Sequence, residues 1–154
     1  MLDEYRVRDF MTSPATVVSQ DARLIDAALL LRSTGIRHLP VVDGDRLVGV
    51  LTDRDIQRCA PSRLEGTTQE EYNAVFQRTP LSQVMMREPQ FVSRETPLSQ
   101  AAALLIEYKY GCLPVVEEGR VVGMITVIDM LTVFRRILTG EMAPSPGSVP
   151  VACR

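Results

Sequence analysis

The sequence is poor in the residues that most catalytic and metal-binding sites require. It contains one histidine, His38, and three cysteines, Cys59, Cys112 and Cys153, which are far apart and form no CxxC pair. A single histidine excludes metal sites built from several histidines and most nucleophile schemes that need a second one. The cysteine spacing indicates neither a disulfide framework nor a zinc site. The sequence also lacks a P-loop glycine pattern and clustered carboxylates, so we expect no catalytic residues, no metal ligands and no enzyme activity.

The chain also lacks a large excess of charge and any long apolar run. Its 17 basic and 19 acidic residues are spread along the sequence and give a net charge of −2, so no long-range field attracts polyanions. We therefore expect no nucleic acid partner. No run approaches the roughly 18 apolar residues of a membrane span, and the N-terminus is charged where a secretory signal is apolar. These absences predict a soluble cytoplasmic protein without a membrane partner.

What the sequence does contain is an internal repeat. With an offset of 74 residues, Leu39–Asp55 aligns without a gap on Leu113–Asp129, and nine of the seventeen aligned positions are identical. Nearer the N-terminus, Met11 aligns with Met86 at an offset of 75, which indicates a one-residue insertion. A unit of about 60 residues is too small to bury its apolar face alone, so the two copies are expected to pack together.

Each copy predicts the same order of elements. A short extended piece rich in β-branched or aromatic residues comes first. In the first copy an amphipathic helix is expected to start at Asp21 and end at Gly35, because apolar residues recur there at helical spacing. Two apolar strands around a turn at Asp43 and Gly44, and a second helix starting near residues 53–55, complete the copy. The expected fold class is α+β, with two pseudo-symmetric β-α-β-β-α repeats packed through their sheets.

The repeat also sets the expected domain boundaries. The first repeat covers residues 1–62 and the second covers residues 81–138. Residues 63–80 form a connector with a short helix, for which Thr67 or Thr68 is the expected cap. Residues 139–154 contain three prolines and two glycines without periodicity, which predicts a mobile C-terminal tail.

Both copies place a threonine three residues before an aspartate, where the last strand meets the last helix. The pairs are Thr52 with Asp55 and Thr126 with Asp129. One interpretation is a capping box, although such boxes prefer the longer Glu or Gln at the third position, so the shorter aspartate is free to point elsewhere. The other is a nucleotide site, in which aspartate accepts from ribose hydroxyls while threonine and the helix N-terminus donate to phosphate. Both interpretations are open at this point.

These residues resemble a known family. Each copy carries LPVV and, farther on, a glycine, two apolar residues and T-x-x-D. Such a unit closely resembles the cystathionine beta-synthase (CBS) domain. The tandem resembles a CBS pair, or Bateman module, over about residues 7–133. The resemblance implies a stand-alone regulatory, energy-sensing protein that binds adenosine-containing ligands in clefts between the repeats. Such ligands include AMP, ADP, ATP and S-adenosylmethionine, with or without Mg, and no further cofactor is implied. It also implies a homodimer, often disc-shaped.

The resemblance assigns ligand contacts residue by residue. Asp55 and Asp129 would hold ribose hydroxyls, and Thr52 and Thr126 would contact ribose or phosphate. The backbone of residues 16–17 and 91–92 would meet the adenine. The full set of implied ligand-binding residues is Thr16, Val17, Arg37, His38, Leu39, Thr52, Arg54, Asp55, Phe91, Val92, Tyr110, Gly111, Cys112, Thr126 and Asp129.

The two expected sites differ where the repeats disagree. Arg37, His38 and Arg54 of the first copy correspond to Gly111, Cys112 and Ile128 of the second. An arginine at a helix start opposes the helix dipole, so a phosphate partner explains Arg54 better than helix stability does. We expect the first site to prefer ligands with more phosphate, and the second to take a less charged adenosine compound.

One helix face of the second copy predicts assembly, and the capping interpretation gives a second class of function. Leu131, Phe134, Ile137 and Leu138 form a helix face with no obvious partner within the sequence, which predicts a homodimer independently of the resemblance. The alternative function is a homodimerisation or protein-interaction module with unoccupied clefts, in which T-x-x-D serves only as a cap. The sequence does not indicate which protein is regulated.

Overall fold

The computed structural model describes residues 5–62 and 66–141. Residues 63–65 of the expected connector, and the expected tail from residue 142 onward, lie outside the described residues. The chain divides into two compact units. We call Thr16–Pro89 the first unit, and the described residues of Met1–Ala15 and Gln90–Arg154 the second unit.

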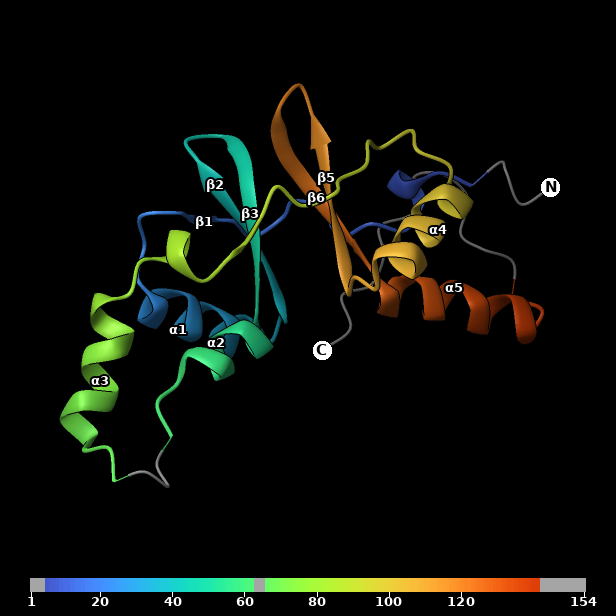
Figure 1. The fold of residues 1–154 in the computed structure, drawn as a ribbon. Helices are drawn as coiled ribbons and strands as arrows, with labels where there is room; N and C mark the ends of the chain where they lie inside the picture. The colour runs from blue at the N-terminus through green and yellow to red at the C-terminus, as the bar shows by residue number, and fades with distance from the viewer. Residues whose placement is uncertain (1–4, 63–65, 142–154) are drawn as a thin grey trace. The chain divides into compact units, whose positions relative to one another are not determined.

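The first unit is a small sheet with helices, in the order expected from the sequence (Figure 1). Strand β1 pairs in parallel with β2, β2 pairs antiparallel with β3, and β3 pairs antiparallel with β4. The elements are β1 (Val18–Ser19), α1 (Leu24–Thr34), β2 (His38–Asp43), β3 (Arg46–Thr52), α2 (Asp53–Cys59), α3 (Gln69–Arg78), the 3-10 helix η4 (Leu81–Gln83) and β4 (Met86–Arg87).

The second unit repeats this order. Val92 forms a parallel bridge with Val115, as Val18 does with Val41 in the first unit. Strands β5 and β6 pair antiparallel, with an irregularity at the position where β2 and β3 have theirs. The elements are the 3-10 helix η2 (Val7–Asp9), α4 (Leu98–Tyr108), β5 (Cys112–Glu117), β6 (Arg120–Thr126) and α5 (Val127–Leu138). The expected α+β class with two copies of one unit is confirmed.

The first helix begins later than the sequence suggested. Helix α1 starts at Leu24, and its N-cap residue is Arg23, so the expected start at Asp21 is wrong. The reason is that Asp26 Oδ2 accepts a hydrogen bond from the Arg23 backbone nitrogen at 2.8 Å, which satisfies the helix start from inside. The predicted end is confirmed, because Gly35 adopts a left-handed conformation with φ of 72° and stops the helix.

The two units are not simple consecutive halves of the chain. The backbone nitrogen of Val7 donates to Thr96 O at 3.0 Å, so the N-terminal segment packs against the second repeat. At the equivalent place in the first unit, Leu81 N donates to Ala22 O at 2.9 Å. Val7 and Leu81 are both fully buried, and each lies in the hydrophobic core of its unit. Each unit therefore completes its core with a segment that belongs to neither of its helix–hairpin blocks.

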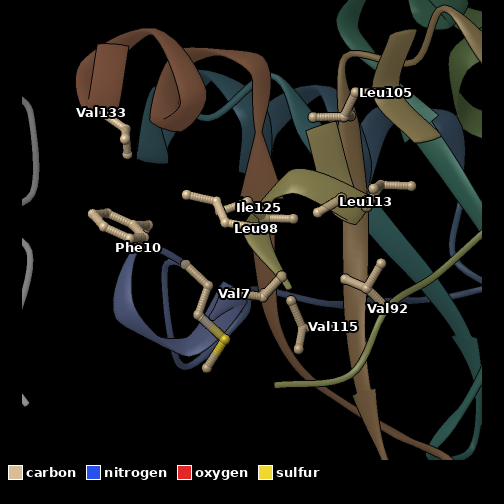
Figure 2. Close-up of a cluster of buried hydrophobic side chains, with 11 residues drawn as sticks. Val7, Phe10, Val92, Leu98, Leu105, Leu113, Val115, Ile125 and Val133 are labelled. Atoms are coloured by element: carbon tan, nitrogen blue, oxygen red, sulfur yellow. The ribbon is translucent and has the colours of Figure 1, made fainter. Parts of the chain in front are cut away.

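Figure 2 shows this arrangement in the second unit, where Val7 and Phe10 of the N-terminal segment face Ile125 and Val133. The first unit has an equivalent core that joins residues of α1, β2, β3 and α2 to Leu81 and Met85. Complete burial of a large aliphatic side chain contributes roughly 1.5–3 kcal/mol, so these two short segments stabilise the units substantially.

The glycine that recurs in both repeats is explained by these segments. A Cβ on Gly49 would lie 2.5 Å from the sulfur of Met85, and one on Gly123 would lie 2.7 Å from the carbonyl oxygen of Thr12 and 3.1 Å from the sulfur of Met11. Met11 and Met85 are therefore equivalent, at an offset of 74 residues. The alignment of Met11 with Met86 was wrong, because the buried methionine that contacts the glycine is Met85, whereas Met86 is exposed.

Helix α3 is the one described helix without a counterpart in the other unit, and it lies beside α1 (Figure 1). Thr68 caps it, since the Thr68 hydroxyl accepts from Glu71 N at 3.2 Å and Glu71 Oε2 accepts from Thr68 N at 2.8 Å. The expected helix in the connector is confirmed, with Thr68 rather than Thr67 as its cap.

Candidate functional site

The first candidate site lies where three segments of the first unit reach the same edge of the sheet. Because β1 is parallel to β2 and β3 is antiparallel to β2, the start of β1, the start of β2 and the end of β3 meet there. His38 is the direct register partner of Thr52, and the backbone nitrogen of Asp53 donates to Arg37 O at 3.2 Å. The topology thus gathers residues 16–17, 37–39 and 52–55 at one edge of the sheet.

The second unit forms an equivalent edge. Cys112 is the register partner of Thr126, and the backbone nitrogen of Val127 donates to Gly111 O at 3.0 Å. Val92 N donates to Pro114 O at 3.0 Å, which brings residues 91–92 to the same place. All predicted site residues of the second repeat therefore lie within one unit, and so do those of the first.

The recurring threonine and aspartate form a capping box in both units. The Thr52 hydroxyl accepts from Asp55 N at 3.2 Å and donates to Asp55 Oδ2 at 2.7 Å, and Asp55 Oδ2 also accepts from Thr52 N at 2.9 Å. Thr126 and Asp129 make the same three bonds at 3.2, 2.8 and 2.7 Å. The capping interpretation is confirmed, and the expectation that the shorter aspartate points elsewhere is wrong for Oδ2, because the extended backbone of each threonine brings its N–H towards the carboxylate.

Capping leaves half of each carboxylate available. No hydrogen bond within the described residues reaches Oδ1 of Asp55 or Asp129, and no buried side-chain nitrogen or oxygen there lacks a partner. Both Oδ1 atoms are therefore open to solvent or to a ligand. The threonine hydroxyls, by contrast, already donate to Oδ2 and accept from a backbone N–H. The aspartate is the acceptor at this edge, and the threonine holds it in place.

The predicted site residues differ in how much of the side chain a ligand can reach. Leu39 is fully buried, and Val92 and Cys112 are nearly so, which leaves them little to offer beyond backbone groups. The exposed members are Thr16, Val17, Arg37, Arg54, Phe91 and Gly111, and the half-buried members are His38, Thr52, Asp55, Tyr110, Thr126 and Asp129. Tyr110 stacks on Tyr108 with 5.3 Å between ring centroids, so one of its faces is already covered.

The electrostatics of the two edges differ. In the first unit, burial lowers the pKa of His38, and Arg37 lowers it further, while Asp53 and Asp55 oppose the shift. His38 therefore presents a neutral imidazole near pH 7. In the second unit, burial raises the pKa of Cys112 to about 12, so the group that replaces His38 is a neutral thiol.

Burial also raises the pKa of Asp129, whereas the hydrogen bonds from the Thr126 hydroxyl and backbone nitrogen lower it. A raised carboxyl pKa means that negative charge is costly at this position. At the second edge, therefore, the ionised form of Asp129 is disfavoured by burial, and the residues at the positions of Arg37 and Arg54 carry no positive charge.

One residue of the first edge, Asp53, was not among the site residues predicted from the sequence. Asp53 is exposed beside Thr52, its Oδ1 accepts from the Arg54 backbone nitrogen at 2.9 Å, and its charge acts on His38. Its place inside the T-x-x-D motif was a usable signal. In the second repeat this position is Val127, so the first edge carries an extra carboxylate as well as extra cations.

Neither a metal-binding cluster nor a membrane-spanning helix is found in the part of the chain that the structure describes. Within residues 5–62 and 66–141, no three His, Cys, Asp or Glu side chains are grouped so that they could hold a metal ion. No helix in those ranges combines the length and the apolar character that crossing a membrane requires.

Comparison with known proteins identifies the family to which this architecture corresponds. The family model of the CBS domain matches residues 7–61 and 81–136. A CBS domain-containing protein of Dictyostelium discoideum is 30% identical over 134 residues, which are 86% of this chain and 92% of that protein.

Two similar solved structures contain ligands. The structure of CBSX2 in complex with AMP is 31% identical, with a TM-score of 0.70 and coverage of 87% of this chain and 98% of that one. The CBS domain pair of protein MJ0100, in complex with 5′-methylthioadenosine and S-adenosyl-L-methionine, is 25% identical, with a TM-score of 0.70 and coverage of 84% and 99%.

Proposed function

The chain belongs to the CBS domain family, as its sequence resemblance indicated, and we propose that its two repeats act as a regulatory module that senses adenosine-containing ligands. The observation that carries the proposal is the open Oδ1 of Asp55 and Asp129, held in the same way at equivalent sheet edges. Similar CBS pairs bind AMP, or 5′-methylthioadenosine and S-adenosylmethionine, which supports ligands of this class. AMP, ADP, ATP and S-adenosylmethionine are the candidates.

The proposed ligand contacts use atoms that make no hydrogen bond within the described part of the chain. Each Oδ1 would accept a hydrogen bond from a ribose hydroxyl, and a charge-assisted bond of this kind contributes about 1.5–3 kcal/mol. Thr52 and Thr126 would act mainly by positioning that carboxylate. In the second unit Val92 N and O both bond to β5, so contacts to the adenine would fall to its exposed neighbour Phe91.

We further propose that the two edges prefer different ligands. Arg37 and Arg54 are exposed at the first edge and available to phosphate, whereas the second edge has Gly111 and the apolar Ile128, whose side chain is 61% exposed. The first edge would take the ligand with more phosphate, and any Mg²⁺ would arrive bound to those phosphates. The second edge would take a less charged adenosyl compound, bind weakly or stay empty.

Calorimetry tests this assignment directly. Titrations of AMP and ATP into the wild type, Arg37→Ala, Arg54→Ala and Asp129→Ala should show that each arginine change weakens ATP at one site by roughly tenfold to a hundredfold. Asp129→Ala should affect only the other site. Two equal ATP sites that are insensitive to both arginine changes would contradict the asymmetry, and no heat with either nucleotide or with S-adenosylmethionine would contradict the proposed function.

The alternative is an interaction module whose edges carry no ligand, and the closed capping boxes favour it because each aspartate already has a structural role. In either case we propose a module that carries out no reaction of its own. Homodimerisation and a cytoplasmic location remain predictions from the sequence.

A further inference from the structure

Helix α3 gives the first unit a hollow that lies away from its sheet edge. The backbone nitrogen of Leu24 donates to Thr79 O at 2.9 Å, which fixes the start of α1 beside the end of α3 (Figure 1). Side chains of these two helices enclose a hollow of about 230 Å³. In the described part of the second unit no helix corresponds to α3, so α4 has no such neighbour there. The hollow is therefore a feature of the first unit and not of the repeat.

The walls of the hollow are mainly apolar. Helix α1 contributes Ile25, Ala28 and Leu29, and α3 contributes Tyr72 and Phe76. The rings of Tyr72 and Phe76 stack with 5.1 Å between centroids and 25° between planes, so they form one continuous aromatic part of the wall. The Leu29 side chain is 58% exposed. A ligand with an apolar body would thus gain free energy by covering these groups.

The size of the hollow indicates what kind of occupant it takes. A cavity of about 150 Å³ with aliphatic and aromatic walls holds one benzene ring. At about 230 Å³, this hollow has room for a body roughly half as large again, such as two fused rings. A partner helix would need a longer groove, because it anchors several side chains over two or more turns. A small molecule fits the hollow better than a protein segment does.

One charged side chain lines the hollow, and it is a cation. Arg32 is exposed, and within the described part of the chain its guanidinium makes no ion pair or hydrogen bond. The other polar lining residues are the uncharged Asn73 and Gln77 together with the Tyr72 hydroxyl, so no carboxylate of the lining competes for Arg32. A guanidinium binds a carboxylate through two parallel hydrogen bonds. The charge of the hollow therefore favours a ligand that carries a carboxylate.

We propose that the hollow between α1 and α3 binds a small carboxylate with a flat apolar body, which pairs with Arg32 and packs against Ala28 and Phe76. None of the lining residues belongs to the sheet edge that the nucleotide proposal uses. The second unit lacks this chemistry, since Ile106 stands at the position of Arg32. The proposal adds a second class of ligand and does not depend on nucleotide binding.

A titration with naphthalene-1-carboxylate tests the proposal, with the full chain and without nucleotide. For a ligand of about thirteen non-hydrogen atoms, ordinary ligand efficiency corresponds to a dissociation constant of about 1 mM. Amide NMR signals of the lining, such as those of Ala28 and Asn73, should shift and saturate in that range. The neutral naphthalene-1-methanol has the same rings and should bind the wild type about threefold or more weakly, because it lacks the charge.

Two variants separate the charge from the apolar body. Arg32→Gln should weaken the carboxylate by about threefold to tenfold and leave the alcohol unchanged. Ala28→Trp should fill the hollow and prevent binding of both compounds. Its matched control is Ala102→Trp, since Ala102 is the equivalent, equally half-buried residue of α4, and this variant should bind as the wild type does. Circular dichroism should show that each variant is folded.

Several results would overturn the proposal. These are a wild type whose lining amides do not shift at several millimolar probe, an Arg32→Gln variant that weakens both compounds equally or neither, and a folded Ala28→Trp variant that still binds. If the wild type does not bind and Ala28→Trp changes the sedimenting mass, a second copy of the chain covers the hollow instead. Asp55→Asn/Asp129→Asn should bind the probe normally, so a failure here is distinguishable from a failure of the nucleotide proposal.

Discussion

At the scale of single residues, the sequence identified the right pairs but not the geometry of their contacts. The recurrence of Thr52 with Asp55 and Thr126 with Asp129 predicted two equivalent positions, and each threonine pairs with the first residue of the preceding strand, at the same end of its hairpin. What the sequence could not decide was whether the aspartate reaches back to the threonine. That depends on the extended backbone at each threonine, with φ near −120°, and not on side-chain length alone.

The single histidine makes one prediction at this scale. Because burial lowers the pKa of His38 in the folded state, the unfolded chain binds its proton more tightly. The free energy of unfolding should therefore fall as pH drops from about 7.5 through the ordinary value of 6.5 towards the lowered folded value. Denaturant melts at pH 7.5 and 5.5 measure this change.

His38→Gln is the control for that prediction, since it removes the titrating group and keeps a polar side chain. Its stability should change less between the two pH values than that of the wild type. Asp129 has the opposite sign, because its raised carboxyl pKa favours the folded state on acidification, so the comparison stays above pH 5. Equal pH dependence in both proteins would contradict the account.

At the scale of elements, periodicity predicted the helices and the hairpins, but it missed how each unit is completed. The segments that contain Val7 and Leu81 are short and show no repeating apolar pattern, so nothing local marks them as core. The usable signal was the recurring glycine in each hairpin. Neither Gly49 nor Gly123 has a positive φ, so backbone conformation does not explain these glycines. A glycine with ordinary strand geometry indicates instead that another segment approaches its backbone closely.

Alanine at these glycines tests that explanation. Gly49→Ala should destabilise the protein by about 1–3 kcal/mol, because the new Cβ would meet both Met85 and the carbonyl oxygen of Met86 at 2.9 Å. Gly123→Ala should behave in the same way. The exposed Arg46→Ala on the same strand as Gly49 serves as the control and should change stability by no more than about 0.5 kcal/mol. Urea melts would contradict the explanation if Gly49→Ala were as stable as Arg46→Ala.

At the scale of the whole molecule, the repeat predicted the family and the recurrence of one unit. It did not predict that the N-terminal segment packs against the second repeat, because hydrogen bonds such as Val7 N to Thr96 O join residues far apart in the sequence. The differences between the copies were readable from the alignment, which replaces Arg54 by Ile128. The sequence did not show how these differences affect α5. In the structure Ile128 and Leu131 of that helix are both more than half exposed to solvent.

The central claim is that the two aspartates bind an adenosine ligand with the oxygen that capping leaves free, and the double variant Asp55→Asn/Asp129→Asn tests it most directly. The amide oxygen of each asparagine can replace Oδ2 and keep the capping bonds, whereas its NH₂ group replaces Oδ1 and cannot accept from a ribose hydroxyl.

The measurement is the melting temperature with and without AMP at about 100 times its wild-type dissociation constant. The wild type should gain roughly 2.7 kcal/mol, a shift of several degrees. The double variant should melt within a few degrees of the wild type without ligand and lose most of the shift with AMP. A double variant that melts far lower but keeps the full AMP shift would show that the aspartates serve the helix starts alone, and would contradict the account.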